Sequence, residues 1–264
     1  MSRDRTGSGE PSATLGLLWR TPEAIGRRKG PARSASIEQL VDGAIALADA
    51  NGLSALTMRA VAERAGIAAM SVYTYVPGKP ELLDLMVDSL YRRMERRDGN
   101  GRPWRERLTA IAEDNRLLLT EHAWMTEVAA LSRPPLGPGL MAKYEHELAA
   151  FDGTGLTDAE TDAALTFLLG FVHGHCRAAH DARRATTDSA MSDAQWWAAN
   201  QPILKRAFDA ETYPRAVRVG AASGEAQGGA WSDEAAWSFG LARVLDGLGI
   251  LIDPRADASA RRDR

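Results

Sequence analysis

The most constraining feature of this 264-residue sequence is the stretch LTMRAVAERAGIAAMSVYTYVPGKPELL, from Leu56 to Leu83. Its pattern predicts two short helices joined by a tight turn and followed by the start of a third helix. Thr57 supplies a hydroxyl that can cap the first helix, and Gly66 can adopt the left-handed conformation that ends it. The second short helix is expected from Ala68 to about Tyr75, with Val72 pointing inward. Two short helices around such a turn form the helix-turn-helix unit that reads DNA.

The second short helix is the expected recognition helix. It carries polar and aromatic side chains that can contact base edges, thymine methyl groups or phosphates. Pro77 and Gly78 break the chain after it, and Pro80 fits the first turn of the next helix. Lys79 at the start of that helix is expected to meet a phosphate. The candidate DNA contacts in this stretch are Thr57, Arg59, Ala69, Met70, Ser71, Tyr73, Thr74, Tyr75 and Lys79.

The segment from Ile37 to Met94 resembles the N-terminal domain of the TetR family of transcriptional regulators. Four blocks match in order and without gaps: SIEQLVDGAIALADANG, LTMRAVAERAGI, SVYTYV and PGKPELLDLMVD. The resemblance implies an all-α protein, with an N-terminal three-helix helix-turn-helix DNA-binding domain followed by a helical ligand-binding and dimerisation domain. It also implies a homodimer, in which two helices from each subunit form a four-helix bundle.

The composition is that of an ordinary folded protein, with 45% hydrophobic and 25% charged residues and a net charge of −3. No apolar run approaches the roughly 18 residues needed to cross a bilayer, and the N-terminus lacks the plan of a secretion signal. The single cysteine, Cys176, excludes an intramolecular disulfide framework and fits a reducing compartment. We therefore expect a cytoplasmic protein with no membrane partner.

The N-terminal region, residues 1–35, is interpreted as a disordered, basic arm. Residues 1 to about 16 are rich in Ser, Gly, Thr and charge, which is typical of disorder. A basic run follows, with Arg27, Arg28 and Lys29 as candidate DNA contacts. Two interpretations remain open for this run: a solvated linker, and an arm along the phosphates or in the minor groove.

The remaining segments divide into the DNA-binding domain, residues 36–98, a ligand-binding and dimerisation domain, residues 99–252, and a charged tail, residues 253–264. Ser36 is expected to cap the first long helix, and a fourth helix is expected from Glu81 to about Arg97. Further on, Thr157 and Glu160 form a capping box that opens a long apolar helix. The other helices are expected at about 103–119, 122–131, 140–151, 193–209 and 232–252, with a flexible loop at 220–229.

The second domain resembles the ligand-binding domain of the tetracycline-repressor branch, on the loop sequence SRPPLGPG. That branch has a histidine and an asparagine where Glu95 and Ile111 stand here, so the resemblance does not extend to tetracycline–magnesium. We expect a small, largely apolar ligand that acts as inducer, oriented by His122 or His173, although core packing explains most of the candidate residues equally well. The candidate pocket residues are Trp104, Ile111, His122, Trp124, Met141, Tyr144, Phe167, Phe171 and His173.

The sequence thus predicts a ligand-responsive repressor that a small molecule releases from a palindromic operator of double-stranded DNA. One alternative is a DNA-binding regulator without ligand control. Another is a metal-dependent enzyme that uses His173, Cys176 and His180, since spacings of three and four residues place such side chains on a common helical face. We expect no metal, no cofactor and no catalytic residue, because no phosphate loop or catalytic motif occurs.

Overall fold

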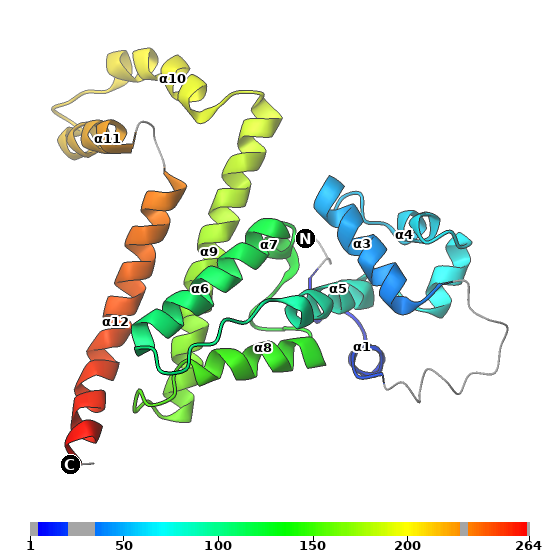
Figure 1. Ribbon diagram of the computed structural model, residues 1–264. Helices are drawn as coiled ribbons and strands as arrows, with labels where there is room; N and C mark the ends of the chain where they lie inside the picture. The colour runs from blue at the N-terminus through cyan, green and yellow to red at the C-terminus, as the bar shows by residue number, and fades with distance from the viewer. Residues whose placement is uncertain (1–4, 21–34, 228–231, 263–264) are drawn as a thin grey trace.

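The computed structural model describes residues 5–20, 35–227 and 232–262, and every regular element in these ranges is a helix. The DNA-binding part lies at one side of the molecule and two long helices lie at the other (Figure 1). The helices are α1 Pro11–Leu18, α3 Ile37–Asn51, α4 Met58–Arg64, the 3-10 helix η1 Ala69–Thr74, α5 Lys79–Arg93, α6 Trp104–Glu121, α7 Met125–Val128, α8 Pro138–Ala149, α9 Asp158–Ser189, α10 Asp193–Ala207, α11 Pro214–Gln227 and α12 Asp233–Arg262.

Local capping chemistry places the helices of the DNA-binding part where the sequence predicts them. Ser36 and Gln39 form a capping box at the start of α3, and the Thr57 hydroxyl accepts a hydrogen bond from the backbone N–H of Ala60 at the start of α4. Gly66 has a φ of 67°, a conformation that glycine adopts without strain, and it turns the chain from α4 towards η1. The helix-turn-helix prediction is confirmed.

The close crossing of α5 and α8 joins the DNA-binding part to the remainder of the chain. A Cβ atom on Gly139 would lie 2.0 Å from the carbonyl oxygen of Asp88, so only glycine allows this approach. The Asp88 carboxylate also accepts a hydrogen bond, 2.9 Å long, from the N–H of Leu140 in the first turn of α8. Movement of α8 should therefore be transmitted to α5.

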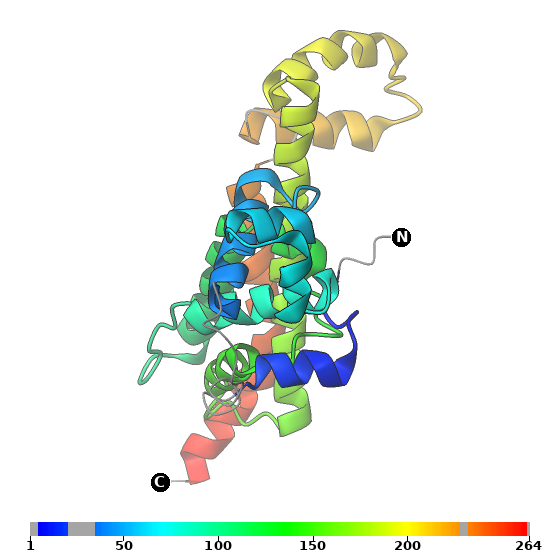
Figure 2. The same ribbon diagram turned by 90° about the vertical axis from the view of Figure 1, so that its right-hand side faces the viewer.

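Two long helices, α9 and α12, run side by side with α6 packed against them. Between α9 and α12 the chain forms α10 and α11, which project beyond the body of the molecule in both views (Figures 1 and 2). Residues 233–254 of α12 are long and apolar enough to cross a membrane by length and composition alone. However, one stripe of this segment is part of the core, namely Trp237, Leu241, Val244, Leu245, Leu248 and Ile252.

The N-terminal segment differs from its predicted disorder, because residues 11–18 form α1 and pack on α5. Leu18 is 3% exposed and Thr6 is 2% exposed, so this polar segment contributes to the core. The Glu10 carboxylate caps α1 by accepting hydrogen bonds from the N–H groups of Ser12 and Ala13. Composition suggested disorder, but local capping and tertiary contacts order the segment.

Several predicted boundaries also differ from the structure. The expected loop at 220–229 is helical as far as Gln227, and the predicted charged tail continues α12 to Arg262. Helix α5 ends at Arg93 instead of about Arg97, and the helix expected at 122–131 shortens to α7. Alanine-rich sequence favours helix enough to outweigh scattered glycines, which explains α11.

Candidate DNA interface and ligand cavity

The 3-10 helix η1 presents two large apolar side chains to the solvent. Met70 is 77% exposed and Tyr73 is 47% exposed, and Ala69 and Thr74 are exposed beside them. Ser71 is half-buried, and its carbonyl accepts a hydrogen bond from the Thr74 hydroxyl. This face is free to meet a groove of DNA.

Tyr75 is placed differently, because it is only 8% exposed and lies in the core with Val72. Side chains three residues apart are superimposed along a 3-10 helix, so Tyr75 follows Val72 inward. The structure therefore does not place Tyr75 on the exposed face with Met70 and Tyr73.

The remaining predicted contacts lie around this face. Thr57 and Arg59 at the start of α4 are exposed. Lys79 is half-buried, and its ammonium group, which has three donors, gives one hydrogen bond to the carbonyl of Leu53 at 3.3 Å. The predicted basic contacts Arg27, Arg28 and Lys29 lie outside the described residues.

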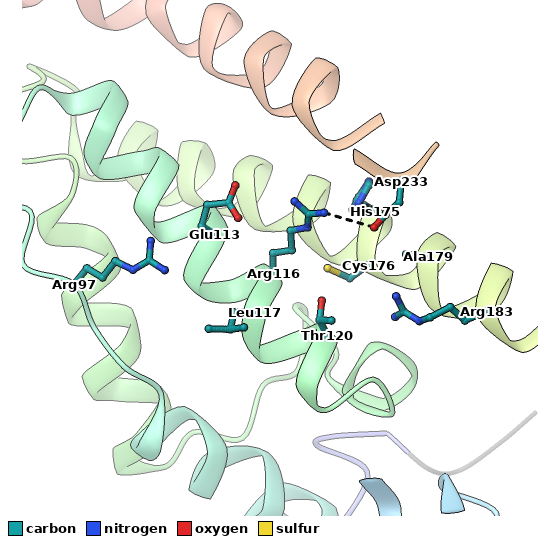
Figure 3. A pocket seen from close by; sticks show the side chains of 10 residues that line it. All are labelled: Arg97, Glu113, Arg116, Leu117, Thr120, His175, Cys176, Ala179, Arg183 and Asp233. Carbon is teal, nitrogen blue, oxygen red and sulfur yellow. Dashed lines mark ion pairs between the residues drawn. The ribbon is translucent and has the colours of Figure 1, made fainter. Parts of the chain in front are cut away.

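A cavity of about 320 Å³ lies between α6, α9 and the start of α12 (Figure 3). Its volume is at the lower end of the range for small-molecule sites. Its lining combines cationic, acidic and apolar side chains, as the close-up shows. The lining residues are Arg97, Glu113, Arg116, Leu117, Thr120, His175, Cys176, Ala179, Arg183 and Asp233.

Arg116 is the central charge of this cavity. Its guanidinium lies over the Trp237 ring, 4.5 Å from the centroid, and donates to Glu234 at 2.9 Å. Burial lowers the pKa of Arg116, but the hydrogen bond to Glu234 and the nearby carboxylates outweigh this effect and raise it. The indole N–H of Trp237 donates in turn to Glu113 at 2.7 Å. Arg116 is thus held in place and stays charged.

A second group of side chains closes the cavity from α9. The Nε2 atom of His175 lies 2.8 Å from the Oδ1 atom of Asp233, so α9 and the first turn of α12 approach closely at this point. Burial raises the pKa of the Cys176 thiol to about 11, so the thiol stays protonated and unreactive at neutral pH. Arg183 lies at the cavity edge, and its backbone carbonyl accepts a hydrogen bond from the Thr187 hydroxyl at 3.1 Å.

None of the nine predicted pocket residues lines this cavity. Ile111 is a core residue, whereas Met141 and Phe167 are exposed on α8 and α9. Tyr144 lines a different, more polar cavity and donates to Asp162 at 2.8 Å. Phe171 stacks on Trp237 with ring centroids 5.3 Å apart, close behind the cavity wall. The predicted residues are therefore not gathered around a single ligand.

Three of the predicted pocket residues make polar contacts instead. The Oδ1 atom of Asp49, on α3, accepts the indole N–H of Trp124 at 2.7 Å and lies 2.8 Å from the Nδ1 atom of His122. These contacts join the DNA-binding part to the turn between α6 and α7. Trp104, at the start of α6, donates to Asp253 of α12 at 2.9 Å.

The histidines of α9 have separate surroundings. Burial, with a smaller effect of the Lys143 charge, lowers the pKa of His173 to about 4, so this ring is neutral at physiological pH. His180 lies 3.4 Å from Glu127, and Cys176 faces the cavity. Across the described residues, no group of three or more His, Cys, Asp or Glu side chains is placed to hold a metal ion.

The sequence did not predict that these residues line one cavity. Glu113, Arg116, Leu117 and Thr120 share one face of α6 at helical spacing, a pattern that also fits a solvated surface. Their partners stand about 60 and 120 residues later in the chain, on α9 and α12. Only the packing of these three helices brings them together.

Comparison with known proteins agrees with the fold. Residues 40–86 match the family described as "Bacterial regulatory proteins, tetR family", and residues 98–252 match "Tetracyclin repressor-like, C-terminal domain". Apo ActR from Streptomyces coelicolor has a similar structure, with a TM-score of 0.67 at 21% identity, covering 86% of this chain and 100% of ActR. ActR in complex with actinorhodin gives a TM-score of 0.66 at 23% identity, covering 83% of this chain and 97% of ActR.

Sequence relatives extend the comparison over the full length. The HTH-type transcriptional repressor DrrR1 of Streptomyces coeruleorubidus is 38% identical over 262 residues, which cover 98% of this chain and 93% of DrrR1. An HTH-type transcriptional regulator of Saccharopolyspora erythraea is 30% identical, over 66% of this chain and 70% of the relative. This chain therefore belongs to the TetR family, as a helix-turn-helix transcriptional repressor and not an enzyme.

Proposed function

We propose that the protein is a homodimer that binds a near-palindromic operator and is released from it by a small molecule bound between α6, α9 and α12. The observation that carries the proposal is the position of Arg97. This residue lines the cavity and lies only four residues after the end of α5, the helix that leads back to the DNA-binding domain. A ligand in the cavity would therefore act close to the end of that helix.

Arg97 is held by a contact that a ligand can change. Its Nε atom lies 2.9 Å from the Oδ1 atom of Asp114, a carboxylate that is only 5% exposed. Burial raises the pKa of Asp114, and the positive charge of Arg97 opposes this rise. A ligand that draws Arg97 towards the cavity would weaken this pair and shift the segment that follows α5. The Gly139 crossing would carry the same shift between α8 and α5.

The lining chemistry supports a ligand richer in polar groups than the largely apolar inducer that the sequence suggested. Arg97, Arg116 and Arg183 offer donors, while Glu113 and Asp233 offer acceptors. Leu117 and Ala179 add apolar surface that suits a hydrocarbon skeleton. ActR, a protein of the same fold, was solved with actinorhodin, which makes that compound a reasonable first probe.

An exposed stripe on α9 and α12 supports the dimer. On α9 the stripe includes Phe167, which is 55% exposed, and the open-faced Gly170 and Gly174. On α12 it includes Phe239, 67% exposed, and Ile250, 76% exposed. Apolar and small residues on two neighbouring long helices suit a bundle with the same helices of a second subunit.

The test compares Arg97→Gln with Arg102→Gln, an exposed arginine of the same segment that does not line the cavity. Actinorhodin and a panel of aromatic compounds with polar substituents are first screened for thermal stabilisation of the wild-type protein. We expect Arg97→Gln to bind operator but to lose release by a compound that releases the wild type and Arg102→Gln. Equal release from all three proteins would contradict the proposed role of Arg97.

A further inference from the structure

We propose that residues 5–20 form a strap that holds the DNA-binding domain to the ligand-binding domain and restricts the positions that the recognition element can take. The strap crosses the first half of α5 and contacts α3, the end of α7 and the loop before α8. Helices α3 and α5 belong to the DNA-binding domain, whereas α7 and the loop before α8 belong to the ligand-binding domain. The inference goes beyond the proposed function, and its tests rest on that function for the dimer and for the operator.

Thr6 joins the strap to the end of α7. Its backbone N–H donates to the carbonyl of Val128 at 3.0 Å, and its hydroxyl donates to the same carbonyl at 3.2 Å. The hydroxyl also accepts from the N–H of Ala130 at 3.0 Å. Because Thr6 is buried, these hydrogen bonds are protected from competition with water.

The next contacts join the strap to α5. The N–H of Gly7 donates to the Oδ1 atom of Asp84 at 2.9 Å, and the N–H of Glu10 donates to the Oε1 atom of Glu81 at 3.0 Å. Both acceptor carboxylates are buried, and each would lose a donor if the strap left. Burial of a carboxylate without donors is costly, so the strap and the start of α5 stabilise one another.

The end of the strap reaches two further segments. The indole N–H of Trp19 donates to the carbonyl of Leu136 at 2.7 Å, in the loop before α8. Leu18 is buried in the core, and Arg20 forms an ion pair with Glu38 of α3. A small cavity beside this junction is lined by residues of the strap, α3 and α5, including Leu18, Arg20, Glu38 and Leu85.

Gly7 offers the sharpest way to release the strap. Its φ is 68°, and a Cβ atom there would lie 2.9 Å from the Cβ atom and 3.0 Å from the carbonyl oxygen of Arg133. Gly7→Ala is therefore both strained and obstructed, whereas Gly16→Ala meets nothing within 4 Å and serves as the matched control. The separate contacts of Asp49 with His122 and Trp124 keep the two domains joined in either variant.

The experiment uses the full-length dimer with a spin label on Asn51→Cys, an exposed position at the end of α3. The native Cys176 is buried and does not compete for the label. Hydrogen exchange at the amides of Gly7, Glu10 and Ala130 reports whether the strap is released. We expect Gly7→Ala to speed this exchange and to broaden the distribution of distances between the two labels, while Gly16→Ala matches the wild type.

The same variants are then titrated with the operator. We expect Gly7→Ala to bind the operator about fivefold more weakly, because the free domain is less well preorganised. This loss of affinity corresponds to the net free energy of about one hydrogen bond. A released strap with an unchanged distance distribution would overturn the proposal. Unchanged exchange in Gly7→Ala and in the double variant Thr6→Val/Gly7→Ala would also overturn it, because the named contacts would then not hold the segment. If the wild type binds no operator, the proposed function fails, but the distance measurement still decides the role of the strap.

Discussion

Asp84 is the residue whose charge state should affect stability most clearly. It is fully buried, and burial is the main cause that raises its pKa from the usual 3.8 to about 6, against the hydrogen bond from Gly7. A raised pKa means that the folded protein favours the protonated form. Its contribution to stability is therefore complete below about pH 4 and is lost as the pH rises through about 6.

Asp84→Asn removes the ionisable group and therefore the loss of stability above pH 6, while the amide oxygen can still accept a hydrogen bond from the N–H of Gly7. At pH 7.5 we expect the variant to be more stable than the wild type by up to about 3 kcal/mol, and at pH 4 to differ little. Thermal unfolding at both pH values measures the effect. Asp42→Asn, which alters an exposed carboxylate paired with Arg93, should change little at either pH. The same shift at pH 4 and pH 7.5 would show that ionisation of Asp84 is not the cause.

Gly139 is the residue on which the α5–α8 crossing depends. Gly139→Ala places a Cβ atom 2.0 Å from a backbone oxygen of α5, which neither helix can avoid without moving. We expect a loss at the upper end of the 1–3 kcal/mol range typical of overpacking, or more. Chemical denaturation measures it, with Gly220→Ala as the control, because nothing lies within 4 Å of a Cβ atom at that helical position. An unchanged midpoint for Gly139→Ala would contradict the rigid crossing.

At the scale of elements, η1 carries the prediction about DNA reading. Tyr73→Ala and Met70→Ala should each weaken operator binding by about 1–3 kcal/mol if the side chain reads bases, with much less loss on random DNA. Tyr213→Ala removes an equally exposed tyrosine far along the chain and should leave binding unchanged. Fluorescence anisotropy on operator and random duplexes separates the two cases. Equal losses on both duplexes would assign η1 to backbone contacts.

Elements defined by local chemistry could be predicted from the sequence. Ser36, Thr57 and Thr157 each cap a helix as expected, because a hydroxyl and the N–H groups it meets lie within three residues. The ordered structure around Leu18 could not be predicted in the same way, because the burial of Leu18 depends on contacts with α5, about 65 residues later in the chain. Tyr75 stands three residues after Val72, a spacing that puts two side chains on one face of a helix, so its burial was within reach of sequence reasoning.

The candidate cavity was beyond prediction for a related reason. Apolar aromatic residues such as Phe167 and Trp124 fit a pocket and a core equally well in sequence, and the structure places them elsewhere. Arg116 and Asp233 fit a solvated surface equally well, yet they meet at the cavity. The packing of α6, α9 and α12 decides which polar residues face one another. This packing cannot be predicted directly from a single sequence.

At the scale of the whole molecule, the exposed stripe on α9 and α12 predicts how subunits meet. Phe239→Lys places a charge in the proposed interface and should shift the protein from dimer to monomer. Leu131→Lys changes an exposed apolar residue in the segment before α8 and should leave the dimer intact. Sedimentation velocity over a range of concentrations measures the difference. A Phe239→Lys protein that remains fully dimeric would place the interface elsewhere.

Footprinting of the purified protein on DNA upstream of its own and neighbouring genes shows whether a symmetric dimer reads an operator through η1. A symmetric dimer with two η1 elements should protect one discrete near-palindrome on one face of the duplex. Its half-sites should be separated by about one helical turn, roughly 34–36 Å, or a multiple of it. Protection should be lost in Tyr73→Ala and kept in Tyr213→Ala. A protected site without dyad symmetry, or no discrete site on any of these sequences, would contradict a dimeric operator-binding repressor that reads DNA through η1.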